Sequence, residues 1–273
     1  MLNILDYRRD VYTSTGNDGI IEYIFKTIGI EKGIFVEFGA WDGIHGCNSK
    51  KLFEEGWSGI FIEGNKDKFK DLIRNYGLYS NVVCINSYIE IEGSNIFDKV
   101  VEKHITKNID FCSIDIDGLD LEVFETFEKY LPTVVCIEGG QMLEPNHERV
   151  PKSISKNNIQ QSLYVIDQSF KNKGYRLLCS YQDSFFVKEK YFNLFDVSQK
   201  IEDIYLDGLE SHHRRLPWIL KTIKTCGLRN KIVKEILKRS NYDKYGYDKR
   251  KEWSVKEKSL VKEIIKEMRI KCQ

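Results

Sequence analysis

The feature that most constrains the fold is the stretch Gly33–Gly64, which reads GIFVEFGAWDGIHGCNSKKLFEEGWSGIFIEG. An apolar run leads into a turn bracketed by Gly39 and Gly43, a helix-compatible stretch follows, and a second apolar run ends in Glu63. A glycine turn after a buried strand brings backbone N–H groups close to a ligand. An acid at the end of the next strand suits the two hydroxyls of a ribose. The segment therefore predicts half of a nucleotide-binding α/β sheet.

The same alternation of apolar runs and helical patterns continues along the chain. It predicts five parallel strands joined by right-handed crossovers. These strands are expected at 34–38, 59–63, 82–85, 111–114 and 133–137. Two further apolar runs, 175–181 and 184–187, predict an antiparallel pair. We expect amphipathic helices at 18–29, 46–56, 65–76, 95–106, 119–130 and 158–173.

The pattern changes in two places. Residues 139–157 are polar and hold two of the four prolines, which is typical of a lid or substrate loop. Beyond about 200 the chain is helical and increasingly charged. We therefore divide it into an α/β domain over 1–200 and a helical, basic C-terminal extension over 201–273.

Charge is unevenly distributed although the net charge is only +1. Residues 221–273 hold 17 basic and 7 acidic residues, whereas residues 1–220 hold 25 and 34. A cationic tail can attract a phosphorylated substrate, an anionic lipid or a nucleic acid. The alternative is a solvated helical face that carries charges of both signs.

Composition narrows the class of protein. No apolar run approaches the roughly 18 residues that a membrane helix needs, and the start MLNILDYRRD lacks the pattern of a signal peptide. The seven cysteines include no CxxC pair, which disfavours a zinc site or a disulfide framework. We expect a cytoplasmic protein.

The glycine turn also excludes some nucleotides. A dinucleotide fingerprint needs a glycine where Trp41 stands, and the bulky indole opposes close approach of a pyrophosphate. The chain has no GxxxxGK[ST] segment, so a P-loop is excluded.

Four segments in order, STGNDGIIEYIF, GIFVEFGAWDGIHGCNS, GWSGIFIEG and FCSIDIDGLD, resemble the FkbM-type family of class I S-adenosylmethionine-dependent methyltransferases. The resemblance covers roughly residues 13–140 and weakens toward 210. It implies a Rossmann-like sheet, mostly parallel, of seven strands with an antiparallel edge. It also implies methyl transfer to a hydroxyl of a sugar, sugar nucleotide or polysaccharide precursor, with a sugar or sugar-phosphate acceptor.

The resemblance places the cofactor at the ends of the strands. Glu63 would bind the ribose hydroxyls, and Asp115 would face the methionine amino group or the reactive centre. The alternative is that either acid caps the helix that follows it. The expected cofactor-binding residues are Glu37, Gly39, Ala40, Asp42, Glu63, Gly64, Asn86, Ser87 and Asp115. Family members often read SQ-x-GED where this chain has Ser14–Asp18, so only Asp18 keeps a predicted contact there.

Carboxylates gather around one predicted strand-end crevice. Asp115, Asp117 and Glu138 offer the oxygen ligands that Mg²⁺ prefers, and such an ion would lower the pKa of an acceptor hydroxyl. The alternative is that the acids cap the helix at 119–130. The same crevice needs a group that removes the acceptor's proton.

The candidate bases are Asp117, His147 in the polar loop and His45 after the glycine turn, with His212 and His213 further along. His147 has the most favourable sequence context because its loop follows the fifth strand. Residues 212–215 (HHRR) form a cationic cluster that suits a phosphate, or a helix end that interacts with its own dipole.

Two other functions fit parts of the sequence. A metal-dependent sugar-nucleotide glycosyltransferase would use Asp115 and Asp117, but it leaves Glu63 and the glycine turn unexplained. A nucleic-acid-binding protein would use the basic tail, whose aromatic residues can stack on bases, but acids interleave with its lysines. Those aromatic residues are Tyr242, Tyr245, Tyr247 and Trp253. The tail also predicts a homodimer through the apolar stripe Val255, Leu260, Ile264 and Ile265.

Overall fold

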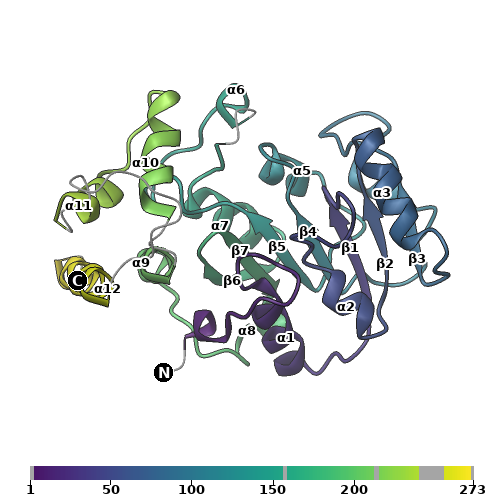
Figure 1. Ribbon diagram of the computed structural model, residues 1–273, viewed down its shortest axis with the longest axis horizontal. Helices are drawn as coiled ribbons and strands as arrows, with labels where there is room; N and C mark the ends of the chain where they lie inside the picture. The colour runs from purple at the N-terminus through teal and green to yellow at the C-terminus, as the bar shows by residue number, and fades with distance from the viewer. Residues whose placement is uncertain (1–2, 156–158, 212–214, 240–254, 272–273) are drawn as a thin grey trace.

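A seven-stranded sheet forms the centre of the molecule (Figure 1). The computed structural model describes residues 3–155, 159–211, 215–239 and 255–271. The strand order is β3-β2-β1-β4-β5-β7-β6; β1 to β5 are mutually parallel, and β7 runs antiparallel to β5 and β6. The strands are β1 (Ile34–Phe38), β2 (Ser58–Ile62), β3 (Val82–Ile85), β4 (Phe111–Ile114), β5 (Val134–Glu138), β6 (Tyr175–Ser180) and β7 (Asp183–Lys188). This architecture confirms the predicted Rossmann-like sheet with its antiparallel edge.

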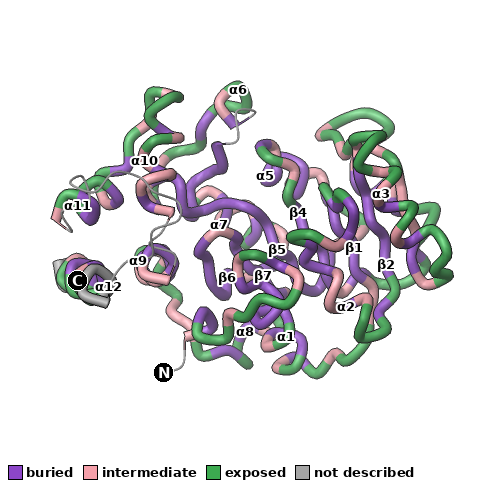
Figure 2. Tube along the Cα trace, in the orientation of Figure 1, coloured by how far each residue is buried: buried purple, intermediate pink, exposed green. Residues whose placement is uncertain are grey.

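Helices cover both faces of the sheet, because the strand side chains are apolar on both sides. The strands at the centre of the sheet are accordingly buried (Figure 2). One face packs against α1 (Asn17–Ile28), α2 (Lys50–Glu54) and α3 (Lys66–Tyr76). The other packs against α4 (Phe97–Val101), α5 (Asp120–Glu125) and α7 (Leu163–Lys171). The remaining elements are η1 (Ile4–Tyr7), α6 (Lys152–Ser155), α8 (Glu189–Phe192), α9 (Ile201–Ser211), α10 (Leu216–Thr225), α11 (Lys231–Arg239) and α12 (Val255–Lys271).

One helix is much shorter than its sequence pattern predicts, because a side chain takes over backbone N–H groups at its end. The Asp98 carboxylate accepts the backbone N–H groups of residues 128–130, so the helix expected at 119–130 is only α5. The helix expected at 18–29 is α1, which begins at Asn17 and ends at Ile28, so it is shifted by one residue.

The C-terminal helices pack on the body of the chain. Buried side chains of α9, α10, α11 and α12 join the same apolar cluster as one face of the sheet. Ile264 and Ile265 are only 1% exposed there, so the predicted dimer stripe is wrong for these two side chains, which pack inside the chain. The predicted cluster residues 212–214 and the tail aromatics in 240–254 lie outside the described residues.

Within the described ranges, no helix combines the length and the apolar character that crossing a membrane requires.

Candidate functional site

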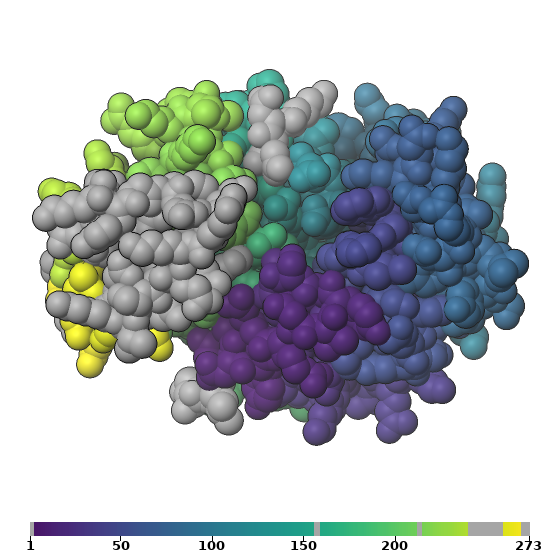
Figure 3. All heavy atoms as spheres, in the orientation of Figure 1, coloured from purple at the N-terminus to yellow at the C-terminus, as the bar shows by residue number. Residues whose placement is uncertain are grey.

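A cavity of about 570 Å³ opens at the carboxyl ends of the parallel strands. Open α/β sheets bind ligands at this edge, and the volume lies within the range of cofactor pockets. The N-terminal segment, purple in Figure 3, adds to its wall. The strand tips and the loops that follow them supply Gly39, Trp41, Glu63, Gly64, Ser87, Tyr88, Asp115, Asp117 and Asp183, and the N-terminal segment supplies Ser14, Thr15 and Asn17.

The predicted cofactor residues divide into two groups. Gly39, Glu63, Gly64, Ser87 and Asp115 line the cavity. The other four do not line it and support its wall from behind, so their contact with a cofactor stays a prediction. They are Glu37, Ala40, Asp42 and Asn86.

Glu37 supports the glycine turn from inside the protein. Its carboxylate accepts the backbone N–H groups of Asn48 (2.9 Å) and Ser49 (2.7 Å) and the thiol of Cys47 (3.1 Å). Burial raises the pKa of Glu37, and these three donors oppose that shift. Glu37 therefore fixes the loop between β1 and α2.

The other three residues also act on the backbone. Ala40 is buried, and its N–H donates to the carbonyl of Ile62 at the tip of β2. The Asp42 carboxylate accepts from His45, and the Asn86 amide donates to the Glu63 carbonyl at 2.7 Å. Ala40 and Asn86 thus tie neighbouring strand tips together, and Asp42 holds the glycine turn.

Gly39 lets β1 approach the end of β4. It adopts φ +64°, and a Cβ there would lie 2.1 Å from the backbone carbonyl oxygen of Asp115. A side chain at this position therefore meets both an unfavourable backbone conformation and an atom that cannot move aside.

Replacing Gly39 by alanine is expected to lower the free energy of unfolding by about 3 kcal/mol, from left-handed strain and overlap with Asp115. Urea denaturation measures the change. Gly29→Ala is the matched control, because Gly29 has φ +75° but a Cβ there would meet no atom of the described residues within 4 Å. It should cost about 1 kcal/mol. Equal costs at both positions would show that the close approach at Gly39 carries no weight.

The Glu63 carboxylate is held at the cavity wall by two backbone groups. Trp41 N–H donates to one oxygen (2.8 Å), and Asn65 N–H donates to the other (2.7 Å). A carboxylate has about four acceptor positions, so two stay available on the cavity side. That number matches the two hydroxyls of a ribose. Next to it, a Cβ on Gly64 would overlap the ring of Tyr88.

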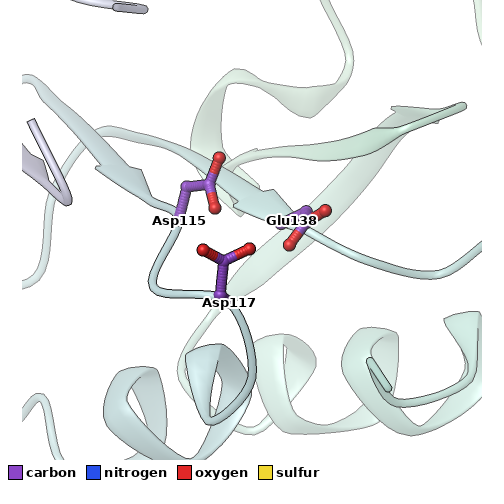
Figure 4. A group of neighbouring side chains, drawn as sticks. All are labelled: Asp115, Asp117 and Glu138. Atoms are coloured by element: carbon purple, nitrogen blue, oxygen red, sulfur yellow. The ribbon is translucent and has the colours of Figure 1, made fainter. Parts of the chain in front are cut away.

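Three carboxyl groups meet where β4 and β5 end. Asp115 follows β4, Glu138 ends β5, and Asp117 lies in the turn before α5, with their carboxyl groups directed toward one another (Figure 4). One oxygen of each lies within 4.8 Å of the others. Asp117 adopts φ +59° in a turn that Asp120 holds, since its carboxylate accepts the N–H groups of Ile116 (2.8 Å) and Gly118 (2.9 Å).

This crowding changes the proton affinity of the group. The Asp115 carboxyl is closely surrounded by protein atoms, although solvent reaches it. This loss of hydration raises the pKa of Asp115 well above the usual range, and the negative charges of Asp183, Asp120 and Asp117 add to the shift. Burial and the charges of Asp115 and Asp120 raise the pKa of Glu138 to about 9. Such a cluster favours either bound protons or a bound cation. The predicted metal ligands are thus brought together by the fold.

The three described candidate bases lie in different places. Asp117 and His45 line the cavity. His147 does not, because the loop directs it elsewhere and its Nδ1 contacts the carbonyl of Glu148 at 2.7 Å. The structure therefore gives the preference for His147 no support, and its role as a base stays a prediction.

Asn17 is a residue of the cavity wall that was not predicted from the sequence. The side-chain amide of this buried residue donates to Asn48 (2.8 Å) and Asp183 (2.6 Å), and its Oδ1 accepts from the hydroxyl of Tyr181. It thereby connects the N-terminal segment to the glycine loop and to β7. Asp18, by contrast, binds the N–H groups of residues 11–13 at 2.8 Å and shapes that segment without lining the cavity. A polar pair before an apolar helix was the only sequence signal.

No protein family model and no curated protein sequence matches the chain. Solved structures that resemble it include M. capricolum TrmK in complex with S-adenosyl-homocysteine, at 13% identity, 91% coverage of this chain, 97% of that chain and a TM-score of 0.44. Another is the N-terminal domain of EvdMO1 with SAH bound, at 10% identity, 63% coverage of this chain, 80% of that chain and a TM-score of 0.44. A third is a SAM-dependent methyltransferase from Aquifex aeolicus, at 15% identity, 61% coverage of this chain, 86% of that chain and a TM-score of 0.35. The fold class rests on the strand order described above.

Proposed function

We propose that this chain is an S-adenosylmethionine-dependent O-methyltransferase of the FkbM type. The observation that carries the proposal is Glu63, whose carboxylate faces the cavity with two acceptor positions left, beside a glycine turn. The four sequence segments that resemble the FkbM family support the subfamily. They also support an acceptor hydroxyl on a sugar, sugar nucleotide or polysaccharide precursor.

Different residues of the cavity bind the cofactor and remove the proton of the acceptor. Glu63 holds the ribose, and Ser87 and Tyr88 border the space for the adenine. S-adenosylmethionine, when bound, supplies an electrophilic methyl group on a sulfonium. Asp117 would take the proton of the acceptor hydroxyl when that hydroxyl is methylated. Alignment of the two reactants supplies most of the remaining rate.

Asp115, Asp117 and Glu138 fit a divalent cation by their chemistry, because three neighbouring carboxylates repel each other until a cation or protons neutralise them. Mg²⁺ at this place would lower the pKa of the acceptor hydroxyl. Asp120 keeps the Asp117 turn in position for either role.

Titration calorimetry with S-adenosylmethionine tests the proposed function. Wild-type protein is expected to bind it and S-adenosylhomocysteine, and not NAD⁺, whose pyrophosphate Trp41 opposes. Transfer of a labelled methyl group to a panel of sugar nucleotides then identifies the acceptor. Absence of binding by the folded wild type would contradict the proposal.

The carboxylate cluster is expected to bind Mn²⁺ and to release about one proton per ion at pH 7, because Glu138 with a pKa of about 9 holds a proton until a cation replaces it. Calorimetry in two buffers of different ionisation enthalpy measures this release. Glu138→Gln should bind the ion more weakly and release fewer protons than wild type, because Asp115 is then the group of this cluster whose pKa stays raised. Asp71→Asn, on the exposed face of α3, is the control and should behave as wild type. Ion binding unaffected by Glu138→Gln would contradict the assignment.

A further inference from the structure

The charges around the cavity are unequal in number. Among the described residues that line it, Glu63, Asp115, Asp117 and Asp183 are acidic, and only His45 and Lys68 are basic. The cofactor of the proposed function carries two positive groups, the sulfonium and the ammonium, and one negative group, the carboxylate of its amino-acid tail. Charge complementarity therefore directs that carboxylate toward the two basic residues.

The sheet order places one of these residues over the path of the tail. Glu63 follows β2 and Asp115 follows β4, and β1 lies between those strands. The glycine turn rises from the tip of β1 and carries His45. A nucleoside whose ribose lies at Glu63 and whose reactive end lies toward Asp115 must cross the tip of β1, where this turn lines the cavity.

His45 is oriented by a carboxylate behind it. Its Nδ1 lies 2.6 Å from Asp42, which also accepts the backbone N–H groups of Ile44 (2.9 Å) and His45 (3.0 Å). The Asp42 side chain is 12% exposed, whereas that of His45 is 74% exposed. A carboxylate that holds one ring nitrogen fixes the direction of the other, which is left for a ligand.

The second basic residue reaches the same corner. Lys68 Nζ lies 5.3 Å from the ring centre of Trp41, and the Trp41 and His45 rings are 6.1 Å apart. Trp41 N–H is also the group that holds Glu63. The ribose acceptor and the two basic side chains are therefore joined through one residue.

We propose that His45 binds the carboxylate of the cofactor's amino-acid tail through Nε2, with Asp42 as its positioning residue and Lys68 as a second, more distant charge. His45 then serves recognition and Asp117 serves proton removal. Because the tail belongs to the cofactor, the assignment rests on the proposed function.

Two ligands that differ only in the tail test the assignment. S-adenosylhomocysteine carries the carboxylate, whereas 5′-methylthioadenosine has the same nucleoside without it. In His45→Ala, the affinity for S-adenosylhomocysteine should fall about tenfold, the value of one exposed charge-assisted hydrogen bond, with that for methylthioadenosine unchanged. His45→Arg, which restores an N–H donor at this position, should recover most of the loss. Asp42→Asn should weaken only S-adenosylhomocysteine, by a smaller factor.

His147→Ala is the matched control, because His147 does not line the cavity, and both affinities should equal those of wild type. Because the His45 side chain is exposed, its removal is expected to leave the protein folded. Equal losses for both ligands in His45→Ala, or no loss for either, would overturn the role of His45 while leaving the proposed function in place. Failure of the wild type to bind either ligand would instead overturn the proposed function.

Discussion

Replacing Glu63 by alanine is expected to weaken the binding of S-adenosylhomocysteine about 100-fold. Two hydrogen bonds from ribose hydroxyls to a charged acceptor are lost together, and each contributes about 1.5 kcal/mol or more. Titration calorimetry measures the affinity directly. Methylthioadenosine should lose affinity by the same factor, because it has the same ribose.

The loss must come from the missing acceptor and not from a disturbed turn. A cofactor analogue that lacks the 2′-hydroxyl should bind wild type more weakly, yet lose less affinity than the parent compound on Glu63→Ala. Glu92→Ala, an exposed acid outside the cavity, is the control for charge alone. Unchanged binding by a folded Glu63→Ala protein would contradict the proposed contact between Glu63 and the ribose.

Replacing Glu37 by alanine is expected to lower the free energy of unfolding by about 3–5 kcal/mol. The buried N–H groups of Asn48 and Ser49 would lose their acceptor, and each unsatisfied buried group costs about 1–3 kcal/mol. Urea denaturation measures the change. Glu22→Ala, which removes exposed ion pairs to Arg9 and Lys51, should cost less than about 1 kcal/mol.

The stability difference between wild type and Glu37→Gln should depend on pH. The pKa of Glu37 in the folded protein lies above its ordinary value of 4.5, because burial favours the protonated form. A raised folded pKa contributes stability that is present below pH 4.5 and is lost as pH rises through the folded pKa. The substitution should therefore cost more at about pH 4.5 than at about pH 8. A constant or opposite difference would contradict the burial of this carboxyl.

The fold could be predicted from the sequence because its signals are local. Short apolar runs alternate with amphipathic helices, and this pattern alone specifies a parallel sheet between two helical layers. The residues directly after each run, such as Glu63 and Asp115, lie at the predicted edge because parallel strands all end there. The antiparallel pair at the edge was equally visible, since its two runs are separated by a short turn.

The roles of side chains inside the site were harder to predict. Glu37 lies within β1 and not after it, and strand alternation puts it on the same side as Phe35, where α2 and its preceding loop pack. This alternation can be derived from the sequence, and it argues against a direct contact between Glu37 and a ligand. The partners of Asn17 are separated from it by up to 166 residues, so no local pattern connects them. The position of His147 depends on how a long polar loop folds.

A crystal structure of the protein with S-adenosylhomocysteine tests the proposed site most directly. The ribose hydroxyls should lie within hydrogen-bond distance of Glu63, the tail carboxylate should approach His45, and the sulfur should lie on the side of Asp115. A ligand bound elsewhere, or a ribose that does not contact Glu63, would contradict the proposed cofactor site.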